Sequence, residues 1–140
     1  IRKTTKIILK FPIKQKHLKY LQGVYALKIR RMEQPDCLDF TDFKVIDSID
    51  FSYCHFVTDE HLHQLSGIHK IILDGTKVTD DGIKSLAGIH TIGLSYCTRI
   101  TDKGIKALAG VHEIDLSDCT RVTDDALQSL AGVHTINLSN

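Results

Sequence analysis

Apolar and polar residues alternate in short segments that recur at a nearly constant distance along the chain. Residues 90–111 read HTIGLSYCTRITDKGIKALAGV, and residues 112–133 read HEIDLSDCTRVTDDALQSLAGV. In each unit an alternating stretch predicts a short strand, and apolar residues three apart after it predict a short helix. A period of about 20–22 residues with this pattern predicts a solenoid of stacked units, because one unit cannot bury its own apolar face.

The repeat extends over almost the whole chain. The predicted repeats are 5–24, 25–46, 47–68, 69–89, 90–111 and 112–133, followed by a partial repeat, 134–140. We therefore expect one domain, 1–140. The partial last repeat leads us to expect a fragment of a longer protein.

Each position of the repeat has a predicted role. The strand residues expected to point inward are Ile49 and Phe51, Ile71 and Leu73, Ile92 and Leu94, Ile114 and Leu116, and Ile136 and Leu138. A small inward residue follows the strand, as Cys97 does, and a free Cys suits a tight buried turn. A Thr-Asp pair then begins the helix, with Thr as the N-cap and Asp near the positive end of the helix. Glycines such as Gly88 end the helices.

Two stretches of this pattern are similar to known families. Leu-Ser-x-Cys-x-x-Ile-Thr-Asp-x-Gly-Ile-Lys-x-Leu-Ala-Gly resembles the cysteine-containing leucine-rich repeats, a subfamily typical of F-box substrate-recognition subunits of ubiquitin ligases. Leu-Ala-Gly-Val-His-x-Ile-x-Leu-Ser resembles repeat proteins of amoebal protists and of the large DNA viruses that infect them. The resemblance covers residues 47–140 well and residues 5–46 loosely. It implies an α/β leucine-rich-repeat solenoid, with short parallel strands on the concave face and short helices on the convex face.

Composition and charge narrow the function classes. Of the 140 residues, 42% are hydrophobic and 25% are charged, which is typical of folded chains and not of disorder. No apolar run is long enough to span a membrane, and no signal peptide is visible. We expect an intracellular protein, cytoplasmic or nuclear, and virion association is the alternative that the viral resemblance implies. The net charge of +1 hides a balance of +9 over residues 1–35 and −8 over residues 36–140.

The outward strand residues predict a partner-binding concave face, the usual binding surface of solenoids. The predicted contact residues are Lys28, Arg30, Arg31, Asp50, Tyr53, Ile72, Asp74, Tyr96, Asp115 and Asn137. The leading hypothesis is a protein-interaction scaffold with a protein partner, and the resemblance extends it to substrate recognition for a ubiquitin-ligase adaptor. These outward residues differ from repeat to repeat. The residues of an ordinary solvated surface would differ as well, so the variation does not distinguish a binding face from a solvated one.

The basic start of the chain is a second candidate site. Its predicted residues are Lys6, Lys10, Lys14, Lys16 and Lys19. The corresponding function is a structural or assembly component, for instance of a viral particle, that docks by this end. Nucleic acid is a further partner of such a patch, and a merely solvated end repeat is the plain alternative. Self-association is a further expectation, through pairing of the open C-terminal edge of the predicted sheet.

No chemistry-bearing motif emerges. The sequence lacks a nucleophile elbow, a phosphate loop and an H-E-x-x-H motif, so we predict no enzyme, no cofactor and no metal site. His69, His90, His112 and His134 share one repeat position and should stack in a column. Such a column could hold a metal ion or respond to pH, but we expect each imidazole to bond the backbone of a neighbouring turn.

Overall fold

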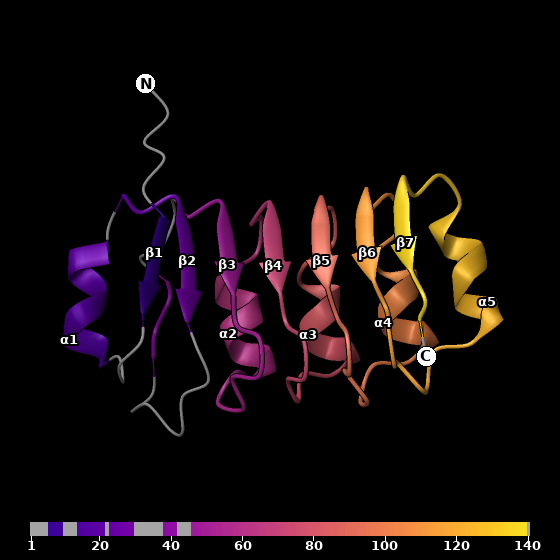
Figure 1. Cartoon of the computed structure of the whole chain (residues 1–140), viewed down its shortest axis with the longest axis horizontal. Coiled ribbons are helices and arrows are strands. Elements are labelled where there is room, and N and C mark those ends of the chain that lie inside the picture. The colour runs from indigo at the N-terminus through magenta and orange to yellow at the C-terminus, as the bar shows by residue number, and fades with distance from the viewer. Residues whose placement is uncertain (1–5, 10–13, 22, 30–37, 42–45, 140) are drawn as a thin grey trace.

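The protein is described from a computed structural model, which covers residues 6–9, 14–21, 23–29, 38–41 and 46–139. Within these residues seven strands form one parallel sheet, in the same order as in the sequence. The strands are β1 (Lys6–Leu9), β2 (Ala26–Ile29), β3 (Ser48–Asp50), β4 (Lys70–Ile72), β5 (Thr91–Gly93), β6 (Glu113–Asp115) and β7 (Thr135–Asn137). Each repeat thus adds one strand beside the previous one, as Figure 1 shows.

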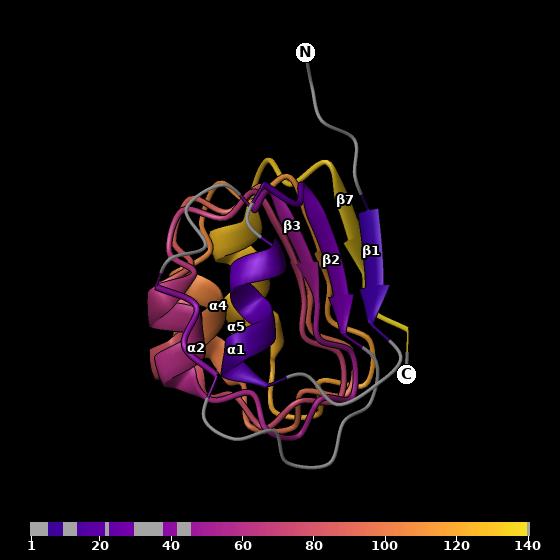
Figure 2. The ribbon, with the colours of Figure 1, turned by 90° about the vertical axis from the view of Figure 1, so that its left-hand side faces the viewer.

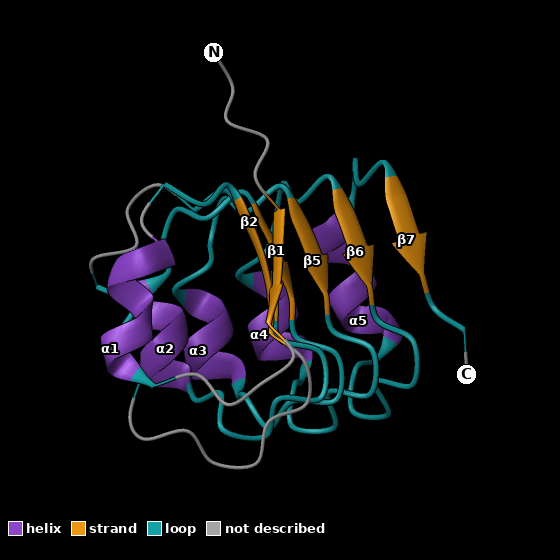
Figure 3. Cartoon of the chain, turned by 60° about the vertical axis from the view of Figure 1, so that its left-hand side comes forward, coloured by secondary structure: helices purple, strands orange, loops and turns teal. Residues whose placement is uncertain are grey.

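The helices all lie on one side of the sheet, as the end-on view in Figure 2 and the rotated view in Figure 3 show. The α-helices are α1 (Gln15–Leu18), α2 (Asp59–Gln64), α3 (Asp80–Lys84), α4 (Asp102–Lys106) and α5 (Asp124–Leu127). Two 3₁₀ turns, η1 (Lys19–Leu21) and η2 (Gln128–Leu130), follow α1 and α5. The predicted α/β solenoid is confirmed, with parallel strands on one face and short helices on the other.

The strands pair in register, so that equivalent residues meet across neighbouring repeats. Ile71 pairs with Ile92, and Ile92 pairs with Ile114. These side chains are at most 2% exposed. In the repeats between residues 47 and 133 the fifth residue, such as Leu94, lies just past the end of the strand and is still buried. The core is therefore a column of apolar layers enclosed between the sheet and the helices.

The last strand departs from the inward prediction. Ile136 is 36% exposed and Leu138 is 45% exposed. Both residues occupy inward positions of the repeat, but no described repeat covers them on the far side. Their exposure follows from their place at the end of the stack.

Local sequence accounts for the helix ends. The Oγ of Thr79 accepts a hydrogen bond from the backbone N–H of Asp81, and Thr101 and Thr123 repeat this contact, so the predicted N-caps are confirmed. After the helical turn Gly88 has a φ of +84°, in the left-handed region that glycine adopts without steric cost. The turn sends the chain back toward the next strand.

Candidate functional site

The concave face is formed by the outward residues of the seven strands. In-register pairing aligns Asp50 with Ile72, Ile72 with Gly93, and Gly93 with Asp115 across four neighbouring strands. The alignment continues to Asn137 on β7. Of the predicted contact residues, Arg30 and Arg31 lie outside the described residues. The other eight lie on the strands or in the turns that follow them.

A hollow lies in the C-terminal half of this face. Its volume is about 210 Å³, and its lining includes Ile72, Asp74, Gly93 and Asp115. The absence of a side chain at Gly93 makes room for it. A Cβ at this position would lie 2.9 Å from Oδ1 of Asp74 and 3.1 Å from Cδ1 of Ile72. The hollow therefore combines an aliphatic wall with carboxylates.

Carboxylates give this part of the face its electrostatic character. Burial raises the pKa of Asp74, and the nearby carboxylates of Asp115 and Asp50 raise it further. Oδ1 of Asp74 also accepts a hydrogen bond from the backbone N–H of Ser95, at 3.1 Å. Asp74 thus lies against the next repeat, beside Gly93, and its charge is only partly compensated.

Three of the predicted contact residues also shape their own turns. Oδ1 of Asp50 accepts hydrogen bonds from the backbone N–H and the hydroxyl of Ser52, at 2.9 and 2.6 Å. Asp115 with Ser117 and Asn137 with Ser139 form the same turn. These acceptor side chains therefore have a structural role that the sequence analysis did not assign.

The predicted cation of β2 is paired within the concave face. The ammonium of Lys28 donates to Oδ2 of Asp50. Burial of Asp50 acts to raise its pKa, but the bonds from Lys28 and Ser52 outweigh it, and the pKa of Asp50 is lowered. This ion pair neutralises the N-terminal side of the acidic region.

Two tyrosines lie in the turns that follow the strands β3 and β5. Tyr53 and Tyr96 have φ values of +59° and +60°, a region that bulky residues rarely occupy. Their side chains are nevertheless 48% and 53% exposed. The ring of Tyr53 covers Gly75 of the next repeat, because a Cβ there would lie 2.5 Å from Cδ1 of the ring. A hydrogen bond to Asp118, also in the next repeat, raises the pKa of Tyr96.

The predicted basic patch does not form one surface within the described residues. Lys6 is exposed on β1, whereas Lys14, Lys16 and Lys19 lie on or beside α1 and η1, on the helix side of the sheet. Lys10 lies outside the described residues. The sheet and helix faces of the first repeat therefore divide these charges, although all of them belong to the same end of the stack.

The histidine column is confirmed as a stack. Successive ring centroids of His69, His90, His112 and His134 are 4.5, 4.4 and 4.6 Å apart. Nδ1 of His90 contacts the hydroxyl of Thr91 at 3.0 Å, and Nδ1 of His112 is buried without a hydrogen-bond partner. At this position neighbouring repeats are joined by backbone hydrogen bonds. For example, the N–H of His90 donates to the carbonyl of His69 at 3.2 Å. The expected bond from each ring to a neighbouring backbone is not among the contacts of the described residues.

The inward cysteines form a second column. The thiol of Cys97 donates to the carbonyl of Leu73 in the preceding repeat at 3.2 Å, and the thiol of Cys119 donates to Leu94 at 3.0 Å. Burial raises the pKa of Cys97 to about 12 and that of Cys119 to about 11, so these thiols are poor nucleophiles. Among the described residues, no group of three or more His, Cys, Asp or Glu is placed to hold a metal ion.

The helices of neighbouring repeats make polar contacts that were not expected from the sequence. Oδ1 and Oδ2 of Asp80 accept from the backbone N–H and the hydroxyl of Thr101, at 2.8 and 2.6 Å. Asp59 binds Thr79 in the same way, and Asp102 binds Thr123. We call these three pairs the Asp–Thr ladder. Its sequence signal is the recurring Thr-Asp dipeptide, whose Asp was expected to act only within its own helix.

The fold is a leucine-rich-repeat solenoid. Its evidence is the parallel sheet, the repeat of 20–22 residues and the buried apolar columns. A family model described as "Leucine Rich repeat" matches residues 90–109 and 111–131. No curated protein matches the chain. In the part of the chain that the structure describes, no helix is long and apolar enough to cross a membrane.

Proposed function

We propose that this chain is a non-catalytic protein-interaction module whose concave face binds a partner polypeptide. The observation that carries the proposal is the pair of exposed tyrosines, Tyr53 and Tyr96, held in left-handed turns beside the strands. Gly75 and Asp118 at the same repeat position are left-handed too, so the turn belongs to the repeat, and it is the exposure of the two large rings that points to a use outside the fold. Tyrosine is also enriched among the residues that contribute most to protein interfaces.

The hollow at Gly93 supports the same surface. It is open toward the concave side and combines the aliphatic side chain of Ile72 with the carboxylates of Asp74 and Asp115. A partner side chain with an apolar stem can bury that stem against Ile72. Leucine-rich-repeat domains are generally protein-interaction modules, and extended concave surfaces are their usual means of binding.

A quantitative capture experiment tests the proposal. The immobilised 140-residue chain is exposed to extract of its native source, and retained proteins are quantified by mass spectrometry. Tyr53→Gly combined with Tyr96→Gly should reduce the retained amount of a specific partner by about tenfold or more. Glycine adopts the left-handed turns without strain, so the double variant should remain folded, as thermal unfolding will show.

The matched control is Lys106→Ala, which removes an exposed side chain from α4 on the opposite face. This variant should retain the partner as the wild type does. Equal retention by the wild type, the tyrosine variant and the control would contradict a concave binding site.

The finer form of the proposal is substrate recognition for an F-box ubiquitin-ligase adaptor in an intracellular setting. Its support is the cysteine position of the repeat and the burial of Cys54, Cys97 and Cys119. Recovery of ubiquitin-ligase subunits in the capture experiment would support this form, and their absence from a specific partner set would contradict it.

The alternative proposal is a structural or assembly component, for instance of a viral particle, that docks by its basic end. It is supported by the exposed lysines Lys6, Lys14, Lys16 and Lys19. Retention that survives the tyrosine variant but is lost on Lys14→Glu would favour this alternative.

A further inference from the structure

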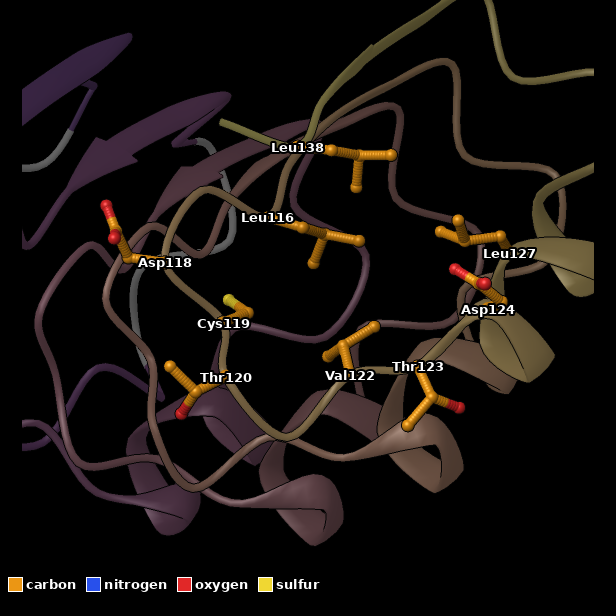
Figure 4. Close-up of a pocket in the computed structure, with 9 residues that line it drawn as sticks. All are labelled: Leu116, Asp118, Cys119, Thr120, Val122, Thr123, Asp124, Leu127 and Leu138. Atoms are coloured by element: carbon orange, nitrogen blue, oxygen red, sulfur yellow. The ribbon is translucent and has the colours of Figure 1, made fainter. Parts of the chain in front are cut away.

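The concave side of the later repeats carries more acidic than basic residues. Among the described residues of β4–β7 and the turns after them, the outward acidic residues are Asp74, Glu113, Asp115 and Asp118. The outward basic residue of this region is Lys70, which begins β4, whereas Asp74 follows the end of that strand. In Figure 4 the carboxylate of Asp118 points away from the buried side chains of Leu116 and Cys119. A partner that covers this surface should therefore supply positive charge.

The ion pair of Lys28 and Asp50 shows how this face binds a cation. The fourth residue of each repeat is outward, and Lys28 on β2 is the register partner of Asp50 on β3. The ammonium of Lys28 donates to Oδ2 of Asp50. Asp115 holds the same position on β6, but its register partner on the preceding strand is Gly93, which has no side chain. Asp115 therefore lacks the cation that a neighbouring strand supplies to Asp50.

Asp50 and Asp115 otherwise have the same local geometry. Oδ1 of each accepts from the backbone N–H and the hydroxyl of the serine two residues later, at 2.9 and 2.6 Å. Oδ2 of Asp115 accepts from the neutral amide of Asn137 at 3.2 Å, where Oδ2 of Asp50 binds an ammonium. The donors to Asp115 within the described residues are thus neutral, so its negative charge is not paired there.

Asp74 adds a second carboxylate beside the same glycine. A Cβ at Gly93 would lie 2.9 Å from Oδ1 of Asp74. This oxygen accepts the backbone N–H of Ser95, whereas Oδ2 has no hydrogen-bond partner among the described residues. Burial raises the pKa of Asp74, and the carboxylates of Asp115 and Asp50 raise it further. A cation beside Gly93 would relieve this repulsion between carboxylates.

The hollow at Gly93 has the size and the walls to hold one long side chain. Its volume of about 210 Å³ is below the range of about 300–1,000 Å³ that is typical of pockets for whole small molecules. Ile72 forms an aliphatic wall, since its Cδ1 and Cγ2 would both lie 3.1 Å from a Cβ at Gly93. Lysine and arginine pack their apolar stems against such walls while their charged groups reach polar atoms.

On the basis of the proposed function of the concave face, we propose that the partner polypeptide inserts a lysine or arginine side chain into this hollow, with its cationic group between Asp74 and Asp115. Its stem lies against Ile72, and Gly93 admits it because no side chain occupies that position. The bound cation is to Asp115 what Lys28 is to Asp50. The partner is therefore a basic segment of polypeptide.

Selection from a displayed library of random short peptides, on the immobilised 140-residue chain, tests this assignment. The enriched peptides should share a Lys or Arg at one aligned position. A synthetic copy of the most enriched peptide is then titrated with the chain, and its affinity is measured by fluorescence anisotropy. Replacing its aligned Lys or Arg with methionine keeps an apolar stem without the charge, and should weaken binding by about tenfold or more.

Asp74→Asn combined with Asp115→Asn removes both charges from the hollow. Asparagine suits the second position, because Asn137 accepts from Ser139 as Asp115 accepts from Ser117. The double variant should bind the selected peptide about tenfold or more weakly than the wild type does. It should also bind the selected peptide and its methionine version equally, since the cation no longer meets its carboxylates.

The matched control is Asp81→Asn combined with Asp125→Asn. These substitutions change the net charge by the same amount, at exposed residues of α3 and α5 on the opposite side of the sheet. The control variant should bind the selected peptide as the wild type does. Thermal unfolding should show that both double variants are folded.

Enriched peptides without an aligned Lys or Arg, or no enrichment at all, would overturn the assignment, as would full binding by the Asp74→Asn/Asp115→Asn variant. If that binding is nevertheless lost in the Tyr53→Gly/Tyr96→Gly variant, the concave face still binds and only the cationic side chain is wrong. Peptides that both of these variants bind as the wild type does would contradict the concave binding site as well.

Discussion

The first helices of the stack and the later ones begin in two different ways. In α2 the backbone N–H of the N-cap Thr58 donates to a residue of its own helix, Nδ1 of His61, at 3.1 Å. In α3, α4 and α5 the backbone N–H of the N-cap threonine instead donates to an aspartate of the preceding repeat, in the Asp–Thr ladder. The first arrangement stabilises one repeat, whereas the second couples two repeats.

The third residue of each helix distinguishes the two arrangements. That residue is His17 in α1 and His61 in α2, but Gly82 in α3 and Gly104 in α4. A Cβ at Gly104 would lie 2.6 Å from Oδ1 of Asp80, so the missing side chain makes room for the incoming carboxylate. A histidine supplies the acceptor itself and occupies that space. A histidine at the third helical position therefore accompanies internal capping, whereas glycine or alanine accompanies capping by the preceding repeat.

The largest expected effect is a difference in the cost of core truncation between the interior of the stack and its first described repeat. Leu94 is fully buried between repeats on both sides, and Leu18 is buried in the first described helix. Leu94→Ala should cost about 4 kcal/mol of unfolding free energy and Leu18→Ala about 2 kcal/mol, because the first described repeat contacts one described neighbour and relaxes more easily. Urea denaturation of both variants measures the difference. Equal costs would contradict unequal coupling along the stack.

The Asp–Thr ladder should contribute the next largest effect. Asp80→Ala leaves the N–H and hydroxyl of Thr101 without their acceptors and should cost about 2 kcal/mol. Asp124→Ala removes an equivalent first-turn carboxylate that caps no described neighbour, so it should cost about 0.5 kcal/mol. Chemical denaturation at a protein concentration where the chain is monomeric compares the two. A cost for Asp124→Ala as large as for Asp80→Ala would show that helix charge, not the ladder, is responsible.

A pH titration should distinguish the two capping modes. Burial lowers the pKa of His61 from its usual value of 6.5, against the weaker opposing influence of the Leu38 carbonyl and of Glu60 and Asp39. The unfolded chain therefore binds more protons than the folded chain as the pH falls below 6.5, and stability is lost in that direction. By contrast, the bonds from Thr123 lower the pKa of Asp102 below 3.8, so its contribution is lost only in stronger acid.

His61→Gln isolates the first of these effects. Glutamine at the third helical position can still accept the Thr58 N–H but does not titrate. The fall in unfolding free energy between pH 7 and pH 5 should be smaller in His61→Gln than in the wild type. An identical slope in the two chains would show that His61 is not the responsible group.

Much of this fold was predictable from the sequence because a repeat places each residue beside its own copy. The apolar columns, the inward cysteines, the threonine caps and the stacked histidines all follow from that rule. Contacts between different positions of successive repeats do not follow from it. Whether Asp80 faces its own helix or Thr101 depends on the sideways offset between neighbouring helices, which no spacing reveals. The tyrosine turns were missed for a similar reason, although Gly75 at the same repeat position was a signal for a left-handed backbone.

The smallest effect tests how much room the ladder needs. Ala126 occupies in α5 the position of Gly104, and Thr123 still binds Asp102 at 2.7 Å. Gly104→Ala should therefore change stability by less than about 1 kcal/mol, because the gain in helix propensity offsets a small shift of Asp80. Ala126→Gly should cost about 1 kcal/mol, since it lowers helix propensity and adds no contact. If Gly104→Ala instead costs as much as Asp80→Ala in the same denaturation assay, the ladder requires glycine at this position, and the alanine of the last repeat marks a weaker junction.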